Sequence, residues 1–331
     1  MDYKDIIKSV RDKNYQPIYF LHGEEPYFID AISNVIANEV LDESERDFNQ
    51  TITYGKEIEP LQLISMAKQF PMMSDRQVII IKEAQDVKNW DAFESYFDQP
   101  QPSTILVICY KYKKFDSRKK VFKAAAKSGI TFQSEKIKEY QLPTWIEKAV
   151  SEKGYGITDK ASNLLAEFLG NDLGRIINEL DKLSLLLEKG TKINDVHIEE
   201  NIGISKDYNV FELTNAIATK DVIKANQIIH YFEQNPKAGN MVVITANLFS
   251  FFQRLMYIHF LPNKSPESIT SALKVHPFVA KQLAGQARMY SPKKIAQNIS
   301  YLREYDLKSK GIGSATAPEE LMRELIFVLM H

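Results

Sequence analysis

The 331-residue chain is too long to fold around a single hydrophobic core, so its length predicts two or three domains. Its hydrophobic share of 44% and charged share of 26% are ordinary for a globular protein in water. The formal net charge of −1 excludes a global electrostatic attraction to DNA or to a membrane. A single cysteine, Cys109, excludes an intrachain disulfide and, with no secretory signal visible, predicts a cytoplasmic location.

The first 140 residues alternate short apolar runs with amphipathic segments. Strands are expected at Ile18–Leu21, Asn49–Tyr54, Val78–Ile81, Ile105–Cys109 and Ile130–Phe132. Helices are expected between them at Tyr27–Val40, Pro60–Phe70, Trp90–Phe97 and Asp116–Lys127. Because strands separated by helices require right-handed crossovers, this region is predicted to be an α/β domain with a mostly parallel sheet.

The turn after the first strand has the layout of a P-loop without its chemistry. A working loop reads G-x-x-x-x-G-K-[ST], and counting from Gly23 places Phe28, Ile29 and Asp30 at the last three positions. Phe28 adds a ring where the backbone must approach a phosphate, and Ile29 has no ammonium group to bind one. Asp30 adds negative charge near a helix N-terminus, which opposes anion binding.

The third predicted strand departs from a nucleotide site in the same way. A Walker B strand ends in an aspartate that holds Mg²⁺, whereas Val78–Ile81 is followed by Lys82 and Glu83. No histidine or cysteine spacing indicates a metal site, and no Ser-His-Asp arrangement is visible. The sequence therefore predicts the frame of a P-loop NTPase with no cofactor, no metal and no catalytic residue.

From residue 140 onward the pattern is helical, and no strand is expected. Residues 141–209 are predicted to form a small bundle. Pro143 opens its first helix, Asp159 and Asp172 cap the next two, and Asn194–Ile202 is a short fourth helix.

The remaining residues, 210–331, are also expected to be helical. Helices are expected at Phe211–Ala218, Asp221–Phe232, Asn240–Phe260, Val279–Met289, Ser291–Lys308 and Pro318–Met330. The most apolar stretch, Met241–Leu261, is interrupted by four polar residues, so we expect a buried helix rather than a membrane span.

Several motifs along the chain share the order of one known family. They are Phe20–Ile29 (FLHGEEPYFI), Asp75–Ile81 (DRQVIII), Tyr140–Ile146 (YQLPTWI), Leu169–Leu173 (LGNDL) and Asn178–Leu183 (NELDKL). Together they resemble the delta-subunit family of bacterial DNA polymerase III clamp loaders over the first 220 residues; the last third is similar mainly in helical layout. The resemblance implies a degenerate AAA+-like domain at 1–140, a helical lid at 141–209 and an all-α collar at 210–331.

The resemblance also implies a function. A delta subunit grips and opens the sliding clamp (beta), whereas ATP is bound by the neighbouring gamma/tau ATPase subunits, beside the delta-prime subunit. Primed DNA is reached through the assembled complex. The chain itself would have no ATPase activity, although it would be part of a DNA polymerase holoenzyme. A stand-alone DNA-binding protein and a divergent P-loop ATPase are the alternatives.

The segment Phe70-Pro71-Met72-Met73 is the candidate clamp-binding element. Pro71 stops the preceding helix and removes a backbone donor, so the two methionines that follow are displayed on a rigid turn. Methionine is adaptable and suits a hydrophobic pocket on a partner. In the family this junction enters the clamp's pocket, and many relatives have an aromatic residue at the place of Met73. The alternative is that both methionines cover the edge of their own sheet.

One cluster of basic residues is a candidate DNA contact. Its members are Lys111, Lys113, Lys114, Arg118, Lys119, Lys120, Lys123 and Lys127. The alternative is a solvated, lysine-rich helix face, which is the commoner outcome for such a charge run.

Overall fold

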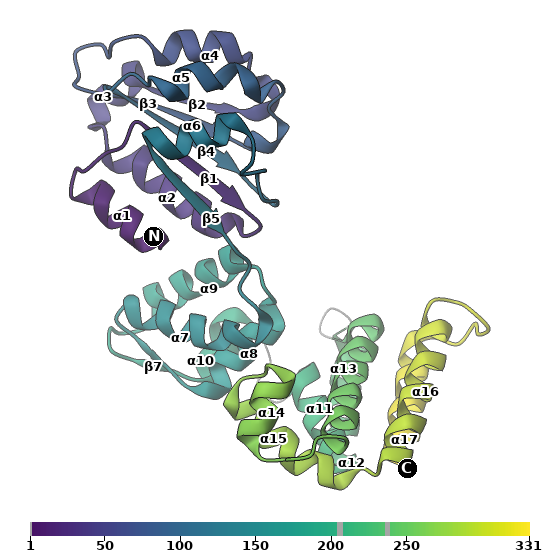
Figure 1. The fold of residues 1–331 in the computed structure, drawn as a ribbon. Helices are drawn as coiled ribbons and strands as arrows, with labels where there is room; N and C mark the ends of the chain where they lie inside the picture. The colour runs from purple at the N-terminus through teal and green to yellow at the C-terminus, as the bar shows by residue number, and fades with distance from the viewer. Residues whose placement is uncertain (1, 204–207, 236–238) are drawn as a thin grey trace. The chain divides into compact units, whose positions relative to one another are not determined.

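The computed structural model describes residues 2–203, 208–235 and 239–331, and Figure 1 shows their fold. The chain divides into two compact units, Met1–Ile137 and Lys138–His331. The first is built of strands and helices, and the second is mostly helical. This confirms the predicted parallel α/β sheet followed by a helical region, whereas the domain boundaries at residues 140 and 209 stay predictions.

A five-stranded parallel sheet forms the centre of the first unit. Its order is β2-β3-β4-β1-β5, with bounds β1 Ile18–Gly23, β2 Gln50–Tyr54, β3 Gln77–Lys82, β4 Thr104–Tyr110 and β5 Ile130–Ser134. All neighbours pair in parallel. The inner strands β1, β3 and β4 are buried along almost their whole length, which explains their continuous apolar sequences. All five predicted strands are therefore confirmed.

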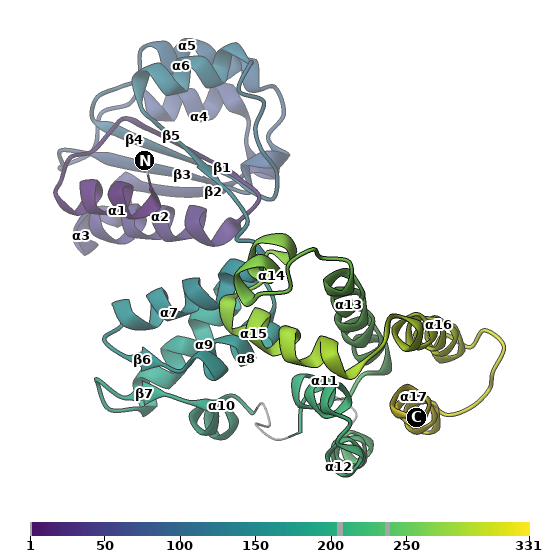
Figure 2. The ribbon, with the colours of Figure 1, turned by 60° about the horizontal axis from the view of Figure 1, so that its bottom comes forward.

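Helices cover both faces of this sheet. Figure 2 shows α1, α2 and α3 on one side and α4, α5 and α6 on the other. Their bounds are α1 Tyr3–Arg11, α2 Pro26–Glu39, α3 Glu43–Asn49, α4 Pro60–Ala67, α5 Glu94–Asp98 and α6 Lys120–Ser128. The core under α4–α6 is rich in aromatic residues, including Phe20, Trp90 and Phe115.

Two of these helices, α1 and α3, were not expected from the sequence. Helix α1 has apolar residues at helical spacing, namely Tyr3, Ile6, Ile7 and Val10, so a local signal was present there and was overlooked. The one buried residue of α3 is Asn49, so α3 has no apolar period. Asn49, predicted to begin a strand, is instead the last residue of α3. The helix predicted from Asp116 begins at Lys120.

The second unit begins with a small group of helices. Their bounds are α7 Leu142–Glu152, α8 Asp159–Leu169, α9 Leu173–Leu186 and α10 Asp195–Ile202. The expectation of no strand here is wrong, because β6 Gly156–Ile157 and β7 Lys192–Ile193 form a short parallel pair. The predicted cap of α8 is also wrong, since the Oγ1 of Thr158 accepts the Ala161 N–H. The Asp172 cap of α9 is confirmed.

Seven further helices complete the part of the second unit that the structure describes. They are α11 Val210–Thr219, α12 Val222–Gln234, α13 Met241–His259, α14 Pro266–Leu273, α15 Pro277–Gln286, α16 Pro292–Ser309 and α17 Pro318–Met330. Helix α14, whose one buried residue is Ile269, was not expected from the sequence. Among the described residues, α13 is the one helix long and apolar enough to cross a membrane, and 44% of its 18-residue apolar window is buried here. It packs against α16 and contributes Leu248, Phe252 and Leu255 to the core.

Candidate functional site

The turn between β1 and α2, where a P-loop would lie, is filled by the chain itself. A Cβ at Gly23 would lie 1.9 Å from the backbone oxygen of Ser134 in β5. This glycine is therefore required by the neighbouring strand, whatever ligand is present. Glu24 donates its N–H to the same oxygen at 3.0 Å, and the Ser134 hydroxyl donates to the Glu25 carbonyl at 2.6 Å.

The N-terminus of α2 carries an internal carboxylate. Glu25 is 4% exposed, and its Oε1 accepts the Tyr27 N–H at 3.1 Å. A helix N-terminus is the place at which a phosphate loop binds its anion, and here a carboxylate of the chain lies there instead. Phe28 packs on Tyr3 of α1 with ring centroids 4.6 Å apart, and Ile29 is fully buried. Both positions thus serve the packing of α2.

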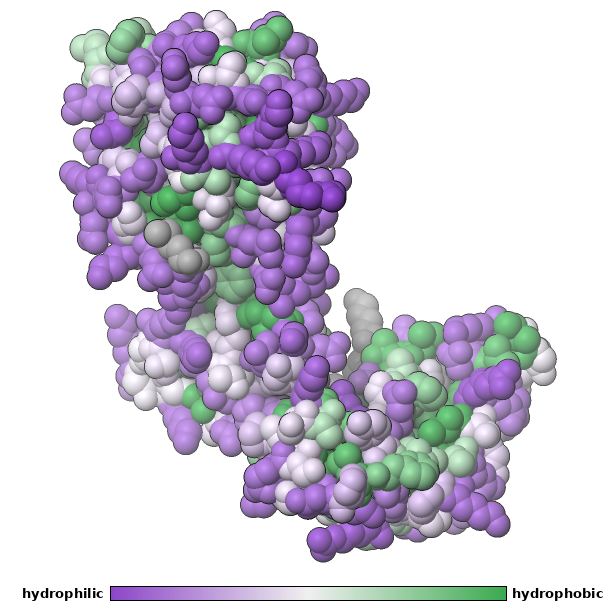
Figure 3. All heavy atoms as spheres, in the orientation of Figure 1, coloured by the Kyte–Doolittle hydropathy of each residue, from purple (hydrophilic) through white to green (hydrophobic). Residues whose placement is uncertain are grey.

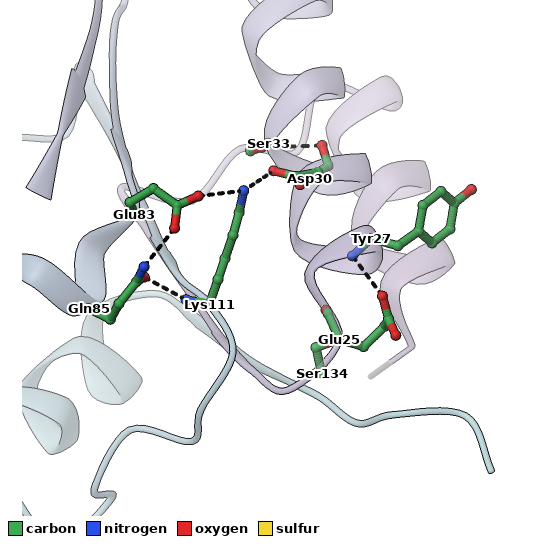
Figure 4. A network of polar contacts seen from close by, with 8 residues as sticks. All are labelled: Glu25, Tyr27, Asp30, Ser33, Glu83, Gln85, Lys111 and Ser134. Atoms are coloured by element: carbon green, nitrogen blue, oxygen red, sulfur yellow. Dashed lines mark hydrogen bonds and ion pairs between the residues drawn. The ribbon is translucent and has the colours of Figure 1, made fainter. Parts of the chain in front are cut away.

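An ion-pair network joins three elements at the carboxyl end of the sheet (Figure 4). The ammonium group of Lys111, just after β4, lies 2.8 Å from the Asp30 carboxylate in α2 and 3.1 Å from Glu83, just after β3. Gln85 donates to the other oxygen of Glu83 at 2.6 Å and accepts the Lys111 backbone N–H at 3.1 Å. Glu83 itself has φ +48°, a strained value for a residue with a side chain.

The charges in this network stabilise one another. Burial alone would lower the pKa of Lys111, but the hydrogen bonds and negative charges of Asp30 and Glu83 outweigh it and raise that pKa. Burial would raise the pKa of Glu83, but hydrogen bonds from Gln85 and Lys111 outweigh it and lower that pKa. Lys111 and Glu83 are therefore both charged at neutral pH.

Lys111 corrects one expectation from the sequence. Its place in the chain groups it with surface lysines, but its side chain is only 9% exposed and is held by two carboxylates. In a P-loop NTPase, the position of Asp30 and the end of β3 hold Mg²⁺. Here a lysine ammonium is the cation between them. Among residues 2–203, 208–235 and 239–331, no group of three or more His, Cys, Asp or Glu side chains is arranged to hold a metal ion.

The other predicted basic residues lie at the surface. Lys113, Lys114, Arg118 and Lys119 are exposed in the segment before α6. Lys114 pairs with Glu135 at 3.3 Å and Arg118 with Asp116 at 2.9 Å, whereas Lys119 lies over the Phe115 ring. The segment is held to the sheet by His22, whose Nδ1 accepts the Phe115 N–H at 3.2 Å. Burial, with the charge of Lys114, lowers the pKa of His22 to about 4, so the ring is neutral.

The loop between α4 and β3 exposes large apolar side chains. Phe70 is 82% exposed, Met72 56% and Met73 99%. Met73 has φ +53°, a left-handed conformation that is uncommon for a residue with a side chain. Met73 is almost fully exposed and so covers nothing of its own sheet, and Met72 keeps more than half of its surface in water. We name this loop, Phe70-Pro71-Met72-Met73, the methionine loop.

A buried amide that was not expected from the sequence contacts this loop. Asn49 Oδ1 accepts the Met72 N–H at 2.7 Å, and Asn49 Nδ2 donates to the Met72 carbonyl at 2.9 Å. Gln77 Nε2 donates to the carbonyl of Gln69, immediately before the loop, at 2.6 Å. These contacts cross as many as 23 residues of sequence, so no local pattern indicates them.

Comparisons with known proteins match the N-terminal and the C-terminal parts of this chain to the same subunit. The family model described as DNA polymerase III, delta subunit, matches residues 19–135, and the model for the C-terminal domain of that subunit matches residues 207–328. The DNA polymerase III subunit delta of Bacillus subtilis (strain 168) is 27% identical over 336 residues, covering 98% of this chain and 95% of that protein. The solved structure of the Bacillus subtilis DNA clamp loader delta protein has the same fold, with a TM-score of 0.60, 24% identity and 99% of each chain covered.

Proposed function

This chain belongs to the family of DNA polymerase III delta subunits, and from that membership we propose that it binds the sliding clamp and opens its ring. It acts as a non-catalytic member of the clamp loader, in which neighbouring gamma/tau subunits bind and hydrolyse ATP and the delta-prime protein completes the assembly. Its own P-loop position is filled by Glu25 and by the Lys111 network, which supports a role in binding rather than turnover.

The exposure of the methionine loop is the observation that carries this proposal. Three large apolar side chains lie in water on one short loop, and Met73 is 99% exposed. The free energy of such a group falls when a partner's pocket removes it from water. We propose Phe70, Pro71, Met72 and Met73 as the residues that enter the clamp.

Calorimetric titration of the clamp with two variants tests this proposal. Burying each methionine is worth roughly 1.5–3 kcal/mol, so Met72→Ala/Met73→Ala is expected to lose on the order of 3–6 kcal/mol, or about 10²–10⁴ in Kd. The thermal midpoint should not change, because these side chains are exposed. Met289→Ala, which removes a 47% exposed methionine from the second unit, is the matched control and should bind normally. Normal clamp binding by the double variant would overturn the assignment.

An apolar surface on the second unit supports a contact with neighbouring subunits. Val242, Val243, Phe249 and Tyr257 belong to α13 and are 42–52% exposed. Figure 3 shows hydrophobic side chains at the surface over α13 and α16. We propose that residues 141–209 act as a lid and 210–331 as the collar that joins the ATPase subunits, in the cytoplasm.

A contact with primed DNA within the assembled complex is a second proposal. It is supported by the exposed lysines Lys113, Lys120 and Lys123, for which no ion pair is found within the described part of the chain. Each lysine–phosphate contact adds about one unit to the slope of log affinity against log salt concentration, so removing three such contacts should make that slope about three units less steep. Replacing these lysines with serine and titrating DNA at several salt concentrations measures that slope; an unchanged slope would exclude the contact.

A further inference from the structure

We propose that Asn49 is a positioning residue that fixes the methionine loop in its binding conformation before the clamp arrives. The inference rests on the proposed function of that loop and extends it to a residue outside the loop. Asn49 is the last residue of α3, immediately before the edge strand β2. It is 5% exposed, so it does not itself form part of an exposed contact surface.

The side-chain amide of Asn49 pairs with the backbone of one loop residue, Met72. Its side-chain amide accepts the Met72 N–H and donates to the Met72 carbonyl, at 2.7 and 2.9 Å, as a neighbouring strand would. The same Nδ2 also donates to the Glu45 carbonyl at 3.1 Å, which ties the amide to α3. One buried side chain thus satisfies both backbone polar groups of Met72 and fixes their direction.

This anchoring explains the conformation of the next residue. Met73 has φ +53° although it is not glycine, and such a conformation persists only where its surroundings hold it. Gln77 holds the residue before the loop through the Gln69 carbonyl, and the Ser74 hydroxyl accepts the Arg76 N–H just after it. Asn49 holds the middle, next to Met73 itself.

A fixed backbone matters for the affinity of this loop. Ordering a flexible loop on binding reduces affinity, and a loop that is already ordered avoids that loss. The two methionine side chains are themselves flexible, so their ordering cost is added on binding. If Asn49 is removed, the loop spends less time in the competent conformation and the apparent Kd rises in inverse proportion.

A role for Asn49 as a simple helix cap predicts something different. Its bond to Glu45 is local to α3, and loss of that bond alone would destabilise the helix without a specific effect on the clamp. The contacts to Met72 require one donor and one acceptor together. Asn49→Asp keeps an acceptor for the Met72 N–H but places a negative oxygen against the Met72 carbonyl, so it should also release the loop.

The test uses the full chain with Asn49→Ala, Asn49→Asp and a matched control. Ser134→Ala removes another buried side-chain hydrogen bond in the first unit, on β5 at the opposite edge of the sheet from β2. Clamp affinity is measured by calorimetry, exchange of the Met72 amide hydrogen by NMR, and stability by thermal unfolding. We expect both Asn49 variants to bind the clamp at least about tenfold more weakly than the wild type. The amide hydrogen of Met72 should exchange faster in both. Ser134→Ala should change neither.

A double-mutant cycle separates positioning from general destabilisation. If Asn49 acts through the methionine loop, Asn49→Ala should cause no further loss of affinity in the Met72→Ala/Met73→Ala background. Unchanged affinity in Asn49→Ala, or an equal loss in Ser134→Ala, would overturn the inference. No clamp binding by the wild-type chain would instead overturn the proposed function. In that case the Met72 exchange rate still decides whether Asn49 fixes the loop, and an unchanged rate contradicts it.

Discussion

Replacing Lys111 with methionine should destabilise the first unit, because it leaves two carboxylates without their cation. Lys111 contacts Asp30 at 2.8 Å and Glu83 at 3.1 Å, and methionine keeps most of its volume. Glu83 is held in a left-handed conformation beside this contact. The variant therefore removes the charge that joins the end of β4 to α2 and to the end of β3.

The size of the loss follows from the exposure of the three side chains. Breaking a fully buried pair costs about 3–5 kcal/mol, whereas an exposed pair is worth about 0–1 kcal/mol. Lys111 is 9% exposed, but Asp30 and Glu83 are 40% and 30% exposed, so water screens the carboxylates that remain. We expect an intermediate loss of about 2 kcal/mol. With a urea dependence of about 2 kcal/mol per molar, the unfolding midpoint falls by about 1 M.

Tryptophan fluorescence can report this unit alone. Trp90 lies in its core and Trp145 lies in the second unit, so a Trp145→Phe background isolates the signal. Lys114→Met is the matched control, because the Lys114 and Glu135 side chains are 46% and 68% exposed and their pair should be worth under about 1 kcal/mol. A Lys111→Met variant as stable as the control would show that Asp30 and Glu83 do not need a cation between them.

The loss of stability in the Lys111→Met variant should also depend on pH. The pKa of Glu83 is lowered from 4.5, so its stabilising pairing is present above that value and is lost as pH falls through the lower, folded value. The pKa of Lys111 is raised from 10.5, so its contribution is lost only as pH rises above that value. The difference between wild type and Lys111→Met should therefore be largest near neutral pH and narrow as the pH falls below 4.5. An equal difference at neutral and at acidic pH would contradict this account.

Two further predictions concern the division of labour within the clamp loader. Titration of the isolated chain with Mg-ATP should release no heat, because Glu25 lies at the α2 N-terminus and Lys111 between Asp30 and Glu83; a micromolar site competed by a non-hydrolysable analogue would contradict this. A shortened chain of residues 1–209 should still bind the clamp but fail to join the ATPase subunits, since it lacks α13 and its exposed face. Size-exclusion chromatography with each partner measures both, and co-elution of the shortened chain with the ATPase subunits would exclude the collar assignment.

The sheet could be predicted because its inner strands are buried on both faces. Runs such as Val78–Ile81 and Ile105–Cys109 are continuous and rich in branched apolar residues, and such runs have few other stable arrangements. The exposed methionine loop was also predictable, because a proline followed by two methionines at an element junction is a local signal.

Several of the missed features have no local apolar pattern or depend on contacts between distant segments. Helix α3 has one buried residue, and that residue is polar, so hydrophobic periodicity could not reveal it. Lys111 stands in a run of lysines, and only the fold brings it to Asp30 and Glu83. Asn49 is separated from Met72 by 23 positions. Local sequence patterns identified the exposed methionine loop, whereas Asn49, which holds that loop, could be found only from the tertiary structure.

The proposed function predicts that the isolated chain can open the clamp ring by itself. A clamp labelled with a donor and an acceptor fluorophore across its ring interface reports the separation of that interface on mixing. We expect the wild-type chain to reduce energy transfer without ATP and without other subunits, and Met72→Ala/Met73→Ala to leave it unchanged at the same concentration. Energy transfer that stays constant with the wild-type chain would show that the chain does not open the ring, and an equal fall with the double variant would show that the methionine loop is not needed for opening.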